Sequence, residues 1–403
     1  MNKSISLVFV FIFLTAPFII LIQQVEASEN SWTTVSPLPK PYYGVLGAAA
    51  LDGKIYFLGE EISEKYDPAT NNWTEIAPPP IYYLWSAVVA CQDKIYVIGQ
   101  PTQAYDPSTD SWENRTSLPE TIGGYEATVV GNKIYVISGG KPAPLGIVDT
   151  SETTFVYDTA NDSWSRMAPI PTPVVGYASA VLNDKIYIIG GGTATNEPSN
   201  PATTVQVFDP HTNVWTVAKP IPTGVVSAGA VATSGLFAPK RIYVVGGSLY
   251  YSGGGVSSDM VNHGTNLNQV YDPETEEWSS AAPIPEIRWS LSLVNVNDVL
   301  YAVGGINDTV REGVYYDQYR KSRLAPIHVQ ATEKYFPIGY EGLLELTPLA
   351  SSTSPLSPSP SPSSTPTPLP SPSPTQAHLH LLSFCLLRTQ ATLLFTIPTF
   401  VFH

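Results

Sequence analysis

Short apolar segments separated by turn residues recur through the middle of the chain. The segment from Gly47 to Leu51 is followed by the turn pair Asp52-Gly53 and by a second apolar segment from Lys54 to Leu58. Apolar runs of this length, divided by Asp-Gly or Asn-Asn pairs, are typical of β-strands joined by tight turns. The pattern predicts an all-β chain.

The second segment of this pair is repeated along the chain. Each copy carries a tyrosine that follows Lys-Ile or Arg-Ile in five copies and Val-Leu in the sixth: Tyr56, Tyr96, Tyr135, Tyr187, Tyr243 and Tyr301. Successive tyrosines are 39 to 58 residues apart. A period in this range indicates an array of similar structural units rather than chance similarity.

A second motif completes each unit. Five copies are followed by an aromatic-Asp pair and, seven positions after the aromatic residue, by a tryptophan: Trp73, Trp112, Trp164, Trp215 and Trp278. We expect the pair in a third strand and the tryptophan in a fourth. Four-stranded sheets that pack face to face in a ring bury surfaces that a single sheet would expose. The sequence therefore predicts a propeller in which the repeated tryptophans are structural residues between the blades.

The two ends of the repeat predict how the ring closes. Trp32, in a strand from Ser31 to Val35, has no preceding strands of its own, whereas the copy at Tyr301 has no following tryptophan. Pairing these parts gives six blades, with the last blade closed by the N-terminal strand and no free sheet edge. The third strand of this blade lies either at Tyr316-Asp317 or at Lys334-Tyr335-Phe336-Pro337. We favour the second segment because it has the Tyr-x-Pro spelling found at Tyr66, Tyr105 and Tyr271 and lies where the repeats end.

Glycine pairs end the predicted second strand in four copies: Gly139-Gly140, Gly190-Gly191, Gly246-Gly247 and Gly304-Gly305. With the Tyr and Trp spacing, they give the chain a resemblance to the kelch family of propellers, over about residues 30 to 340. The first two copies depart from it, with Gly59-Glu60 and Gly99-Gln100. The resemblance implies a six-bladed kelch-type β-propeller with four antiparallel strands per blade. It implies no single function, because kelch propellers serve as binding modules, as scaffolds and, in a few cases, as enzymes.

The segments outside the repeats have a different composition. Residues 1–27 contain Lys3 and a long apolar run and end in Val-Glu-Ala, which predicts a signal peptide or, if it is not cleaved, an N-terminal anchor. We assign residues 28–345 to the propeller. Residues 346–376 are rich in Pro, Ser and Thr, which predicts an extended stalk or linker. Residues 377–403 are mostly apolar and are either a membrane anchor or a tail without a defined role.

The leader and the composition favour a secreted or cell-surface protein. The only cysteines, Cys91 and Cys385, provide no disulfide framework. Four Asn-x-Ser/Thr triplets after the predicted leader are glycosylation candidates that agree with export: Asn72, Asn114, Asn161 and Asn307. The net charge of −14, with only 20 Lys and Arg residues, excludes a broad electrostatic contact with nucleic acid.

Loop lengths predict which face of the ring binds a partner. The connections between the second and third strands are minimal in the first two copies and long in the other four: residues 141–154, 193–204, 248–269 and 306 to about 332. They share a face with the inter-blade connections, and we call it the long-loop face. The opposite face is expected to carry only tight turns, such as Asp52-Gly53 and Asn183-Asp184. Loops on a rigid ring are the usual place for binding residues.

Aromatic residues of the inter-blade connections and of one long loop are candidate ligand-binding residues: Tyr42, Tyr43, Tyr82, Tyr83, Trp85, Tyr125, Tyr177, Trp289, Tyr250 and Tyr251. They could form a stacking surface for sugar rings or a peptide. The alternative is that each of them packs between neighbouring blades. Several charged residues near the same rim are either part of such a site or solvated loop charges: Glu60, Glu61, Glu126, Glu286 and Arg288.

The catalytic residues of enzymes among related propellers are not matched in this chain. Copper radical oxidases need two histidines and two tyrosines at one metal, and a cysteine cross-linked to a tyrosine. Here His211, His263 and His328 are not expected to form that site. The Ser-x-Asp-x-Gly-x-Thr-Trp box of sialidases is absent. Exported kelch-type sialic acid epimerases also have six blades and a leader, but none of their catalytic residues can be matched.

We therefore expect an extracellular recognition or scaffold module that binds a protein or glycan partner through its long-loop face. We expect it not to be an enzyme and to need neither a cofactor nor a metal. The alternative is an exported sugar isomerase or epimerase similar to sialic acid mutarotases, and a copper oxidase is less favoured.

Overall fold

The computed structural model describes residues 28–42, 44–83, 86–143, 146–193, 201–250, 263–316 and 322–341. All of them belong to the first of the two compact units into which the chain divides, Met1–Leu349. Within these ranges the regular secondary structure is β-strand throughout, so the predicted all-β class is confirmed. The predicted leader, stalk and apolar tail lie outside the described residues.

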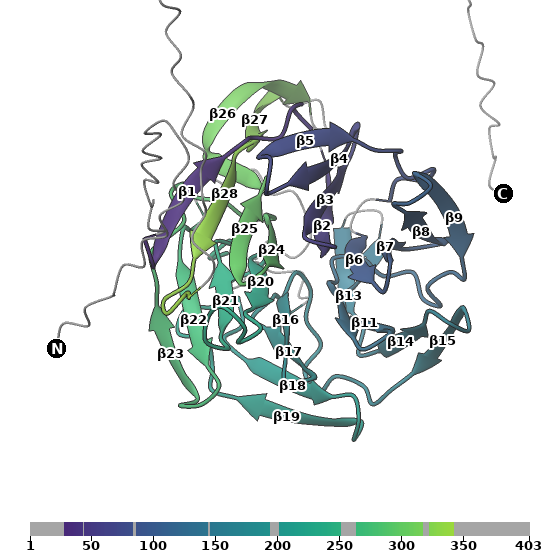
Figure 1. Cartoon of the computed structure of the whole chain (residues 1–403). Coiled ribbons are helices and arrows are strands. Elements are labelled where there is room, and N and C mark those ends of the chain that lie inside the picture. The colour runs from purple at the N-terminus through teal and green to yellow at the C-terminus, as the bar shows by residue number, and fades with distance from the viewer. Residues whose placement is uncertain are drawn as a thin grey trace, which may run out of the picture. The chain divides into compact units, whose positions relative to one another are not determined.

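Six four-stranded antiparallel sheets form the blades of a propeller (Figure 1). The first three blades, each from its inner to its outer strand, are β2 (Val45–Leu51), β3 (Lys54–Gly59), β4 (Ile62–Asp67) and β5 (Asn72–Glu75); β6 (Ala87–Cys91), β7 (Lys94–Ile98), β8 (Thr102–Asp106) and β9 (Ser111–Arg115); and β10 (Ala127–Val130), β11 (Lys133–Ile137), β14 (Thr154–Asp158) and β15 (Ser163–Arg166).

The other three blades have the same inner-to-outer order. They are β16 (Ala178–Leu182), β17 (Lys185–Ile189), β18 (Val205–Asp209) and β19 (Val214–Ala218); β20 (Gly229–Ala232), β21 (Ile242–Val245), β22 (Asn268–Asp272) and β23 (Glu277–Ser280); and β24 (Ser292–Val296), β25 (Val299–Val303), β28 (Thr332–Phe336) and β1 (Ser31–Val35). The predicted six-bladed propeller is therefore confirmed.

The N-terminal strand closes the ring. β1 pairs antiparallel with β28, with Ser31 opposite Phe336 and Val35 opposite Thr332, and the two strands lie side by side in Figure 1. This confirms both the predicted closure and the favoured third strand at Tyr335. Tyr316 instead ends strand β26 in a separate two-stranded sheet, and Asp317 lies outside the described residues.

Strand pairing explains the spacing of the aromatic-Asp and Trp motif. A four-residue turn between the third and fourth strands places the two rings on directly opposed positions, as for Tyr66 and Trp73. Their ring centroids are 4.9 Å apart, and Trp32 and Tyr335 repeat this distance in the closing blade. Opposed aromatic rings of this kind stabilise antiparallel pairs.

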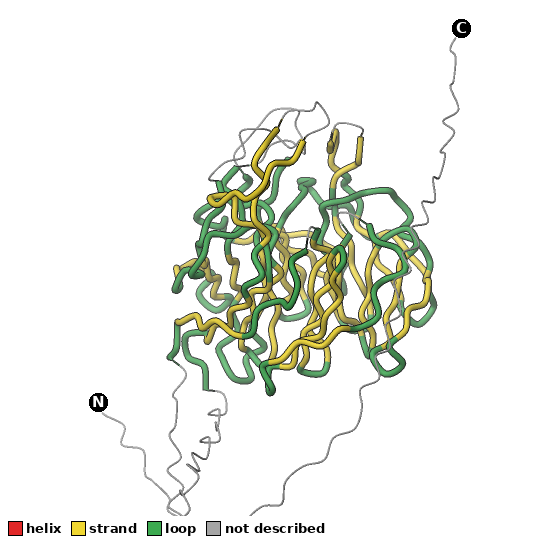
Figure 2. Tube along the Cα trace, turned by 90° about the horizontal axis from the view of Figure 1, so that it is seen from above, coloured by secondary structure: helices red, strands yellow, loops and turns green. Residues whose placement is uncertain are grey.

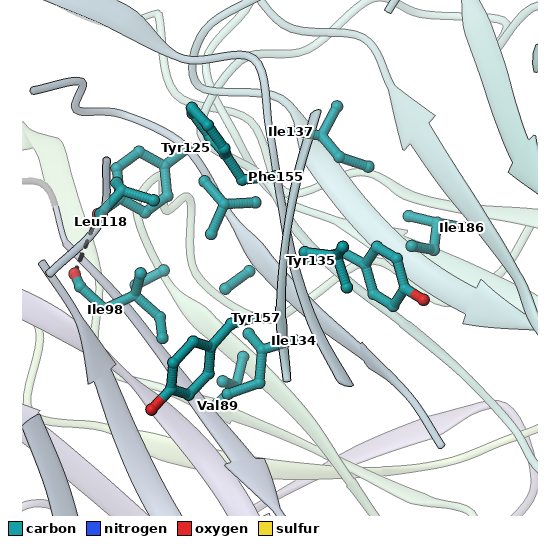
Figure 3. Close-up of a cluster of buried hydrophobic side chains, with 14 of the residues drawn as sticks. Val89, Ile98, Leu118, Tyr125, Ile134, Tyr135, Ile137, Phe155, Tyr157 and Ile186 are labelled. Atoms are coloured by element: carbon teal, nitrogen blue, oxygen red, sulfur yellow. Dashed lines mark hydrogen bonds between the residues drawn. The ribbon is translucent and has the colours of Figure 1, made fainter. Parts of the chain in front are cut away.

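Each blade also packs against its neighbours through the alternating side chains of its strands. In the third blade the ring of Tyr157 points towards the second blade, where Tyr96 lies 6.2 Å away, whereas Tyr135 points towards Phe208 of the fourth blade at 6.4 Å. Figure 3 shows these two tyrosines on opposite sides of the blade, near Val89 and Ile186 respectively. The core of the protein therefore consists of the seams between blades.

The tryptophans link each blade to the one before it. In all six blades the indole N–H donates to a backbone carbonyl just after the fourth strand of the preceding blade, at 2.8 to 3.0 Å: Trp73 to Ser36, Trp112 to Ala77, Trp164 to Thr116, Trp215 to Ala168, Trp278 to Lys219 and Trp32 to Ala282. The ring is thus joined by one repeated hydrogen bond at every seam, including the seam beside the closing strand.

A second repeated hydrogen bond accompanies the tryptophan. Two positions before it, an Asn or Asp with φ between 47° and 58° accepts the backbone N–H at the same place in the preceding blade: Asn71, Asp110, Asp162, Asn213 and Asn30. Asn and Asp adopt this left-handed conformation more readily than other residues with a side chain. In four of these blades the same oxygen also accepts the hydroxyl proton of the tyrosine in the third strand.

Two of the predicted long loops are themselves β-hairpins. β12 (Gly140–Ala143) pairs with β13 (Gly146–Thr150), and β26 (Ile306–Tyr316) pairs with β27 (Ser322–His328). Figure 2 shows strand pairs rising from one face of the ring. The sequence predicts only long loops at residues 141–154 and 306 to about 332, without the strands inside them.

The prediction that the opposite face carries only tight turns is wrong in the fifth blade. There residues 233–241 connect β20 to β21. The connection is organised by the buried carboxylate of Asp298, which accepts the backbone N–H groups of Leu236, Phe237 and Ala238 at 2.9 to 3.2 Å. Burial opposes the charge of Asp298, but hydrogen bonds from the backbone of Ser234, Phe237 and Ala238 and from the side chain of Asn295 hold its pKa below the ordinary value.

Candidate functional site

The long-loop face is built where inter-blade connections pair with the ends of second strands. Isolated β-bridges join Gly123 to Gly140, Val175 to Gly192, Val226 to Ser248 and Trp289 to Ile306. Each long loop therefore starts beside the segment that leads into the inner strand of a blade. This pairing places the loops, the inter-blade connections and the mouth of the central channel on one face.

The glycine pairs make this pairing possible. The N–H of Gly191 donates to the carbonyl of Val225 at 2.9 Å, and Gly247 and Gly139 make the same contact to the connections that follow them in the ring. Gly190 has φ of 66°, and a Cβ there would lie 2.6 Å from the oxygen of Val225. A side chain would push the connection away from the strand, so this position requires glycine.

Three of the candidate aromatic residues lie inside the seams. Tyr42, Tyr125 and Tyr177 are no more than 5% exposed. The hydroxyl of Tyr125 donates to the carbonyl of Ile98 in the preceding blade at 3.0 Å, as the dashed line in Figure 3 shows. Tyr177 makes the equivalent hydrogen bond to Ile137. These rings pack between neighbouring blades, which is the alternative to a stacking surface for a ligand.

Other candidate aromatic residues are closer to the surface. Tyr82, Tyr83, Trp289 and Tyr250 are half-buried. Tyr83 covers Gly99 and donates its hydroxyl proton to the carbonyl of Gln100. Tyr250 stacks on His263, with ring centroids 4.6 Å apart and an interplanar angle of 20°. Tyr43, Trp85 and Tyr251 lie outside the described residues.

Arg288 is fully buried and is not a solvated loop charge. Its guanidinium pairs with the buried carboxylate of Glu333 and lies 3.6 Å from Glu286. It also donates to the carbonyls of Gly304 and Ala331, at 3.3 and 3.2 Å. The ion pair therefore ties the connection that leads into the sixth blade to the third strand of that blade.

In three other blades, glutamines tie the inter-blade connection to the third strand. They are not among the residues predicted from the sequence. Gln103, Gln206 and Gln269 each exchange two hydrogen bonds, at 2.7 to 3.0 Å, with the backbone of the connection leading into their own blade. All three lie two positions before the aromatic residue of the aromatic-Asp pair. The repeated Gln-x-aromatic-Asp spelling was the signal that could have revealed them.

The central channel opens on the long-loop face through a cavity of about 210 Å³. Its wall consists of the starts of the inner strands and the residues just before them, and is made mainly of Gly, Ala, Val and Leu, with five serines: Ser86, Ser179, Ser227, Ser290 and Ser292. Among the described lining residues, Glu126 is the only one with a charge. An adjoining cavity of about 310 Å³ continues along the inner strands and is also lined by Glu126.

Glu126 reaches the channel but remains surrounded by protein. Its side chain is exposed to the cavity, yet desolvation by the walls raises the pKa of its carboxyl to about 7. The sequence predicts Glu126 near the rim, either as part of a site or as a solvated loop charge. The structure instead gives it a confined position in which its protonation state changes near neutral pH.

The sequence also predicts that the protein holds no metal and offers four candidate glycosylation sites. Among the described residues, no three His, Cys, Asp or Glu side chains lie close enough together to hold a metal ion. Three glycosylation candidates have exposed side chains: Asn72, Asn114 and Asn161. Asn307 is 4% exposed and its Nδ2 donates to Glu286, so a glycan linked to that nitrogen does not fit this structure.

Comparison with known proteins gives one family match and several relatives. The model of the Kelch motif matches residues 173–222. Kelch-like protein 25 of Xenopus tropicalis is 29% identical over 206 residues, which cover 50% of this chain and 32% of the relative. Beta-scruin of Limulus polyphemus is 25% identical over 231 residues, covering 54% and 23%. The chain therefore spans well under half the length of these relatives, and the matches support a kelch-repeat family.

Solved structures give the same fold. The structure of YjhT covers 74% of this chain, and 96% of its own chain is covered, with a TM-score of 0.56. The sequence identity is 17%, so this similarity shows the propeller fold alone.

Proposed function

We propose that this kelch-repeat propeller is a binding module that holds a protein partner on its long-loop face. The observation that carries the proposal is the concentration of extended structure on that face, where the β12–β13 and β26–β27 hairpins extend the connections between the second and third strands of the third and sixth blades. Hairpins on a rigid ring offer both backbone hydrogen-bonding groups and side chains to a partner. A glycan partner is the second chemistry that half-buried aromatic residues such as Tyr82 and Tyr83 could serve.

The experiment is a hairpin exchange read on protein and glycan arrays. We would replace residues 308–326 by a short Gly-Ser turn in the purified protein and compare its bound partners with those of the parent. The control replaces Asn183-Asp184, in a tight turn on the opposite face, by Asn-Gly. Partners bound by the parent and the control but lost by the hairpin variant support the proposal. Partners that the hairpin variant retains and the control loses would place binding on the other face.

We also propose that the protein is exported and acts outside the cell. The predicted leader and the three exposed Asn-x-Ser/Thr sites support this location. In the part of the chain that the structure describes, no helix has the length and apolar composition needed to span a membrane. Sequencing of the mature N-terminus is expected to start at Ser28, and a start at Met1 would contradict cleavage of the leader.

A sugar isomerase is the second candidate, and Glu126 is the observation that favours it. A carboxyl with a pKa of about 7 can both accept and donate a proton at neutral pH. Among the described lining residues, however, it faces only apolar side chains, serines and a buried tyrosine, without a second acid or base. We therefore favour binding over catalysis. Anomer exchange of N-acetylneuraminic acid, followed by NMR, is expected to be unchanged by the protein, and an acceleration lost in Glu126→Gln would reverse this preference.

A further inference from the structure

We propose that the mouth of the central channel is a binding site for a single organic cation, a protonated amine or guanidinium group of the kind that ends a lysine or arginine side chain. Glu126 is the counter-charge, and the surrounding serines supply further hydrogen-bonding oxygens. The site is separate from the loop contacts of the proposed function, although a protein partner on the same face could provide the cation.

The first support is that Glu126 breaks the repeat. The strand registers align it with a small residue in every other blade: Gly47, Ala87, Ala178, Gly229 and Ser292. Five small residues and one long acidic side chain leave an open channel with a single negative group. Because the ring needs no long side chain at this position, packing does not explain the glutamate.

The backbone of Glu126 is held in place by a buried residue of the next blade. The N–H of Glu126 donates to the hydroxyl of Tyr177 at 3.2 Å, and this hydroxyl lies 3.2 Å from the carbonyl oxygen of Glu126. Tyr177 is 1% exposed and also reaches Ile137 in the seam. The side chain is therefore presented to the channel from a fixed backbone, which reduces the conformational entropy lost on binding.

The chemistry of the wall selects for a cation that donates hydrogen bonds. No Lys, Arg or His is among the described residues that line either cavity. An ammonium group has three donors and no acceptor, so one carboxylate and neighbouring serine hydroxyls can satisfy it. A charge pair is stronger in a confined, partly desolvated site than in bulk water. The net charge of −14 also attracts cations towards the protein.

The ionisation of Glu126 should be coupled to binding of a cation. Desolvation without a nearby positive charge raises the pKa of this carboxyl to about 7, and a bound cation would favour the ionised form and lower that pKa. The titratable groups that face it are Tyr125 and Tyr177, and burial holds the pKa of both far above neutrality. Binding should therefore strengthen as pH rises through 7, by about tenfold from pH 6 to pH 8 for a pKa near 7.

The test uses the full chain and n-butylammonium as the probe. NMR titration of the glutamate carboxyl carbons in the unmodified protein is expected to show one group near pH 7 whose pKa falls when the amine is added. Glu126→Gln should abolish binding of the amine, whereas Glu274→Gln, in an exposed turn, should leave it unchanged. n-Butanol, which has the same alkyl chain without the charge, should not lower the pKa.

A second arm identifies the source of the cation. A flexible Gly-Ser peptide with one central lysine is compared with the same peptide containing norleucine. Binding of the lysine peptide assigns the site to the side chain of a protein partner, and binding of butylammonium alone assigns it to a small-molecule amine. A pKa of Glu126 that the amine does not move, or amine binding that survives in Glu126→Gln, would overturn the proposal. These outcomes are independent of the hairpin exchange, which tests the loops.

Discussion

The seams between blades and the mouth of the channel follow opposite rules. At the seams, every blade has a tryptophan in the same position, as Trp73 shows in the first blade and Trp32 in the closing blade. At the channel mouth, the position of Glu126 holds a small residue in the other five blades. The contrast shows that repeated residues in this chain build the ring, whereas a departure from the repeat is where a ligand is to be sought.

The sixth blade extends this comparison, because it departs from the repeat in its structure as well. Its connection is held by the Arg288–Glu333 ion pair, where the fourth and fifth blades use Gln206 and Gln269. A residue that departs from the repeat can therefore also replace a structural contact of the other blades. The two kinds are distinguished by burial, since Arg288 is fully buried and Glu126 faces an open cavity.

Removal of the closing strand should have the largest effect. Deletion of residues 28–35 removes the whole β1–β28 pairing together with the seam contacts of Asn30 and Trp32. The exposed strand edges should either cause aggregation, measured by size-exclusion chromatography, or abolish cooperative thermal unfolding, measured by circular dichroism. The control begins at Ser28 and keeps β1. Equal melting temperatures for the two proteins would show that closure contributes nothing to stability.

A single seam tryptophan should have the next largest effect. Trp73→Ala is expected to lower the free energy of unfolding by about 3 to 5 kcal/mol, because the side chain is 8% exposed and packs in a seam. Trp73→Phe retains a ring but loses the hydrogen bond to Ser36, at a cost of about 1 kcal/mol from that bond. Val217→Ala, at a position 79% exposed, should change stability by less than about 0.5 kcal/mol. Urea unfolding that ranks these variants differently would contradict the structural role.

The ion pair of the sixth blade can be replaced by the glutamine contact that the neighbouring blades have. Arg288 occupies the position of Val225 in the fifth blade, since the carbonyls of both accept a glycine N–H from the preceding second strand. Arg288→Val should cost about 3 to 5 kcal/mol, because it leaves Glu333 buried without its partner. The double variant Arg288→Val, Glu333→Gln should recover most of this loss in urea unfolding. No recovery would mean that the Gln arrangement does not transfer between blades.

The repeated parts of the fold could be predicted from the sequence because strand pairing repeats with them. The spacing of Tyr66 and Trp73 directly reflects a four-residue turn between opposed positions, and Trp32 revealed the closing strand for the same reason. The third strand at Tyr335 was likewise predictable from its spelling. Glutamines two positions before the aromatic-Asp pairs are a weaker signal of the same kind, because they occur in only three of the blades.

Features that depend on contacts distant in the sequence could not be predicted. The connection of residues 233–241 is held by Asp298, which follows it by about 60 residues, and a local pattern gives no sign of that contact. The burial of Arg288 depends in the same way on Glu333. Glu126 was recognised near the rim, but its confinement follows only when six inner strands surround one channel.

The smallest expected effect is the pH dependence that Glu126 gives to stability. Its pKa is about 7 in the folded protein, above the value near 4.3 of an unfolded glutamate. Between these values the folded state binds a proton that the unfolded state has lost, so its contribution to stability is present at low pH and is lost as pH rises through 7. Glu126→Gln cannot lose this proton. Its melting temperature relative to the parent should therefore increase from pH 5 to pH 8.

Glu274→Gln, in an exposed turn, is the matched control and should show no such trend. Burial also raises the pKa of Glu64 and Glu333, but both residues are present in all three proteins and their contributions cancel in the comparison. Added n-butylammonium should reduce the difference between Glu126→Gln and the parent at pH 8, because the cation stabilises only the ionised carboxylate. A difference that stays constant from pH 5 to pH 8 would mean that Glu126 ionises as an ordinary solvated glutamate, and the channel mouth would then lose its contrast with the surface of the ring.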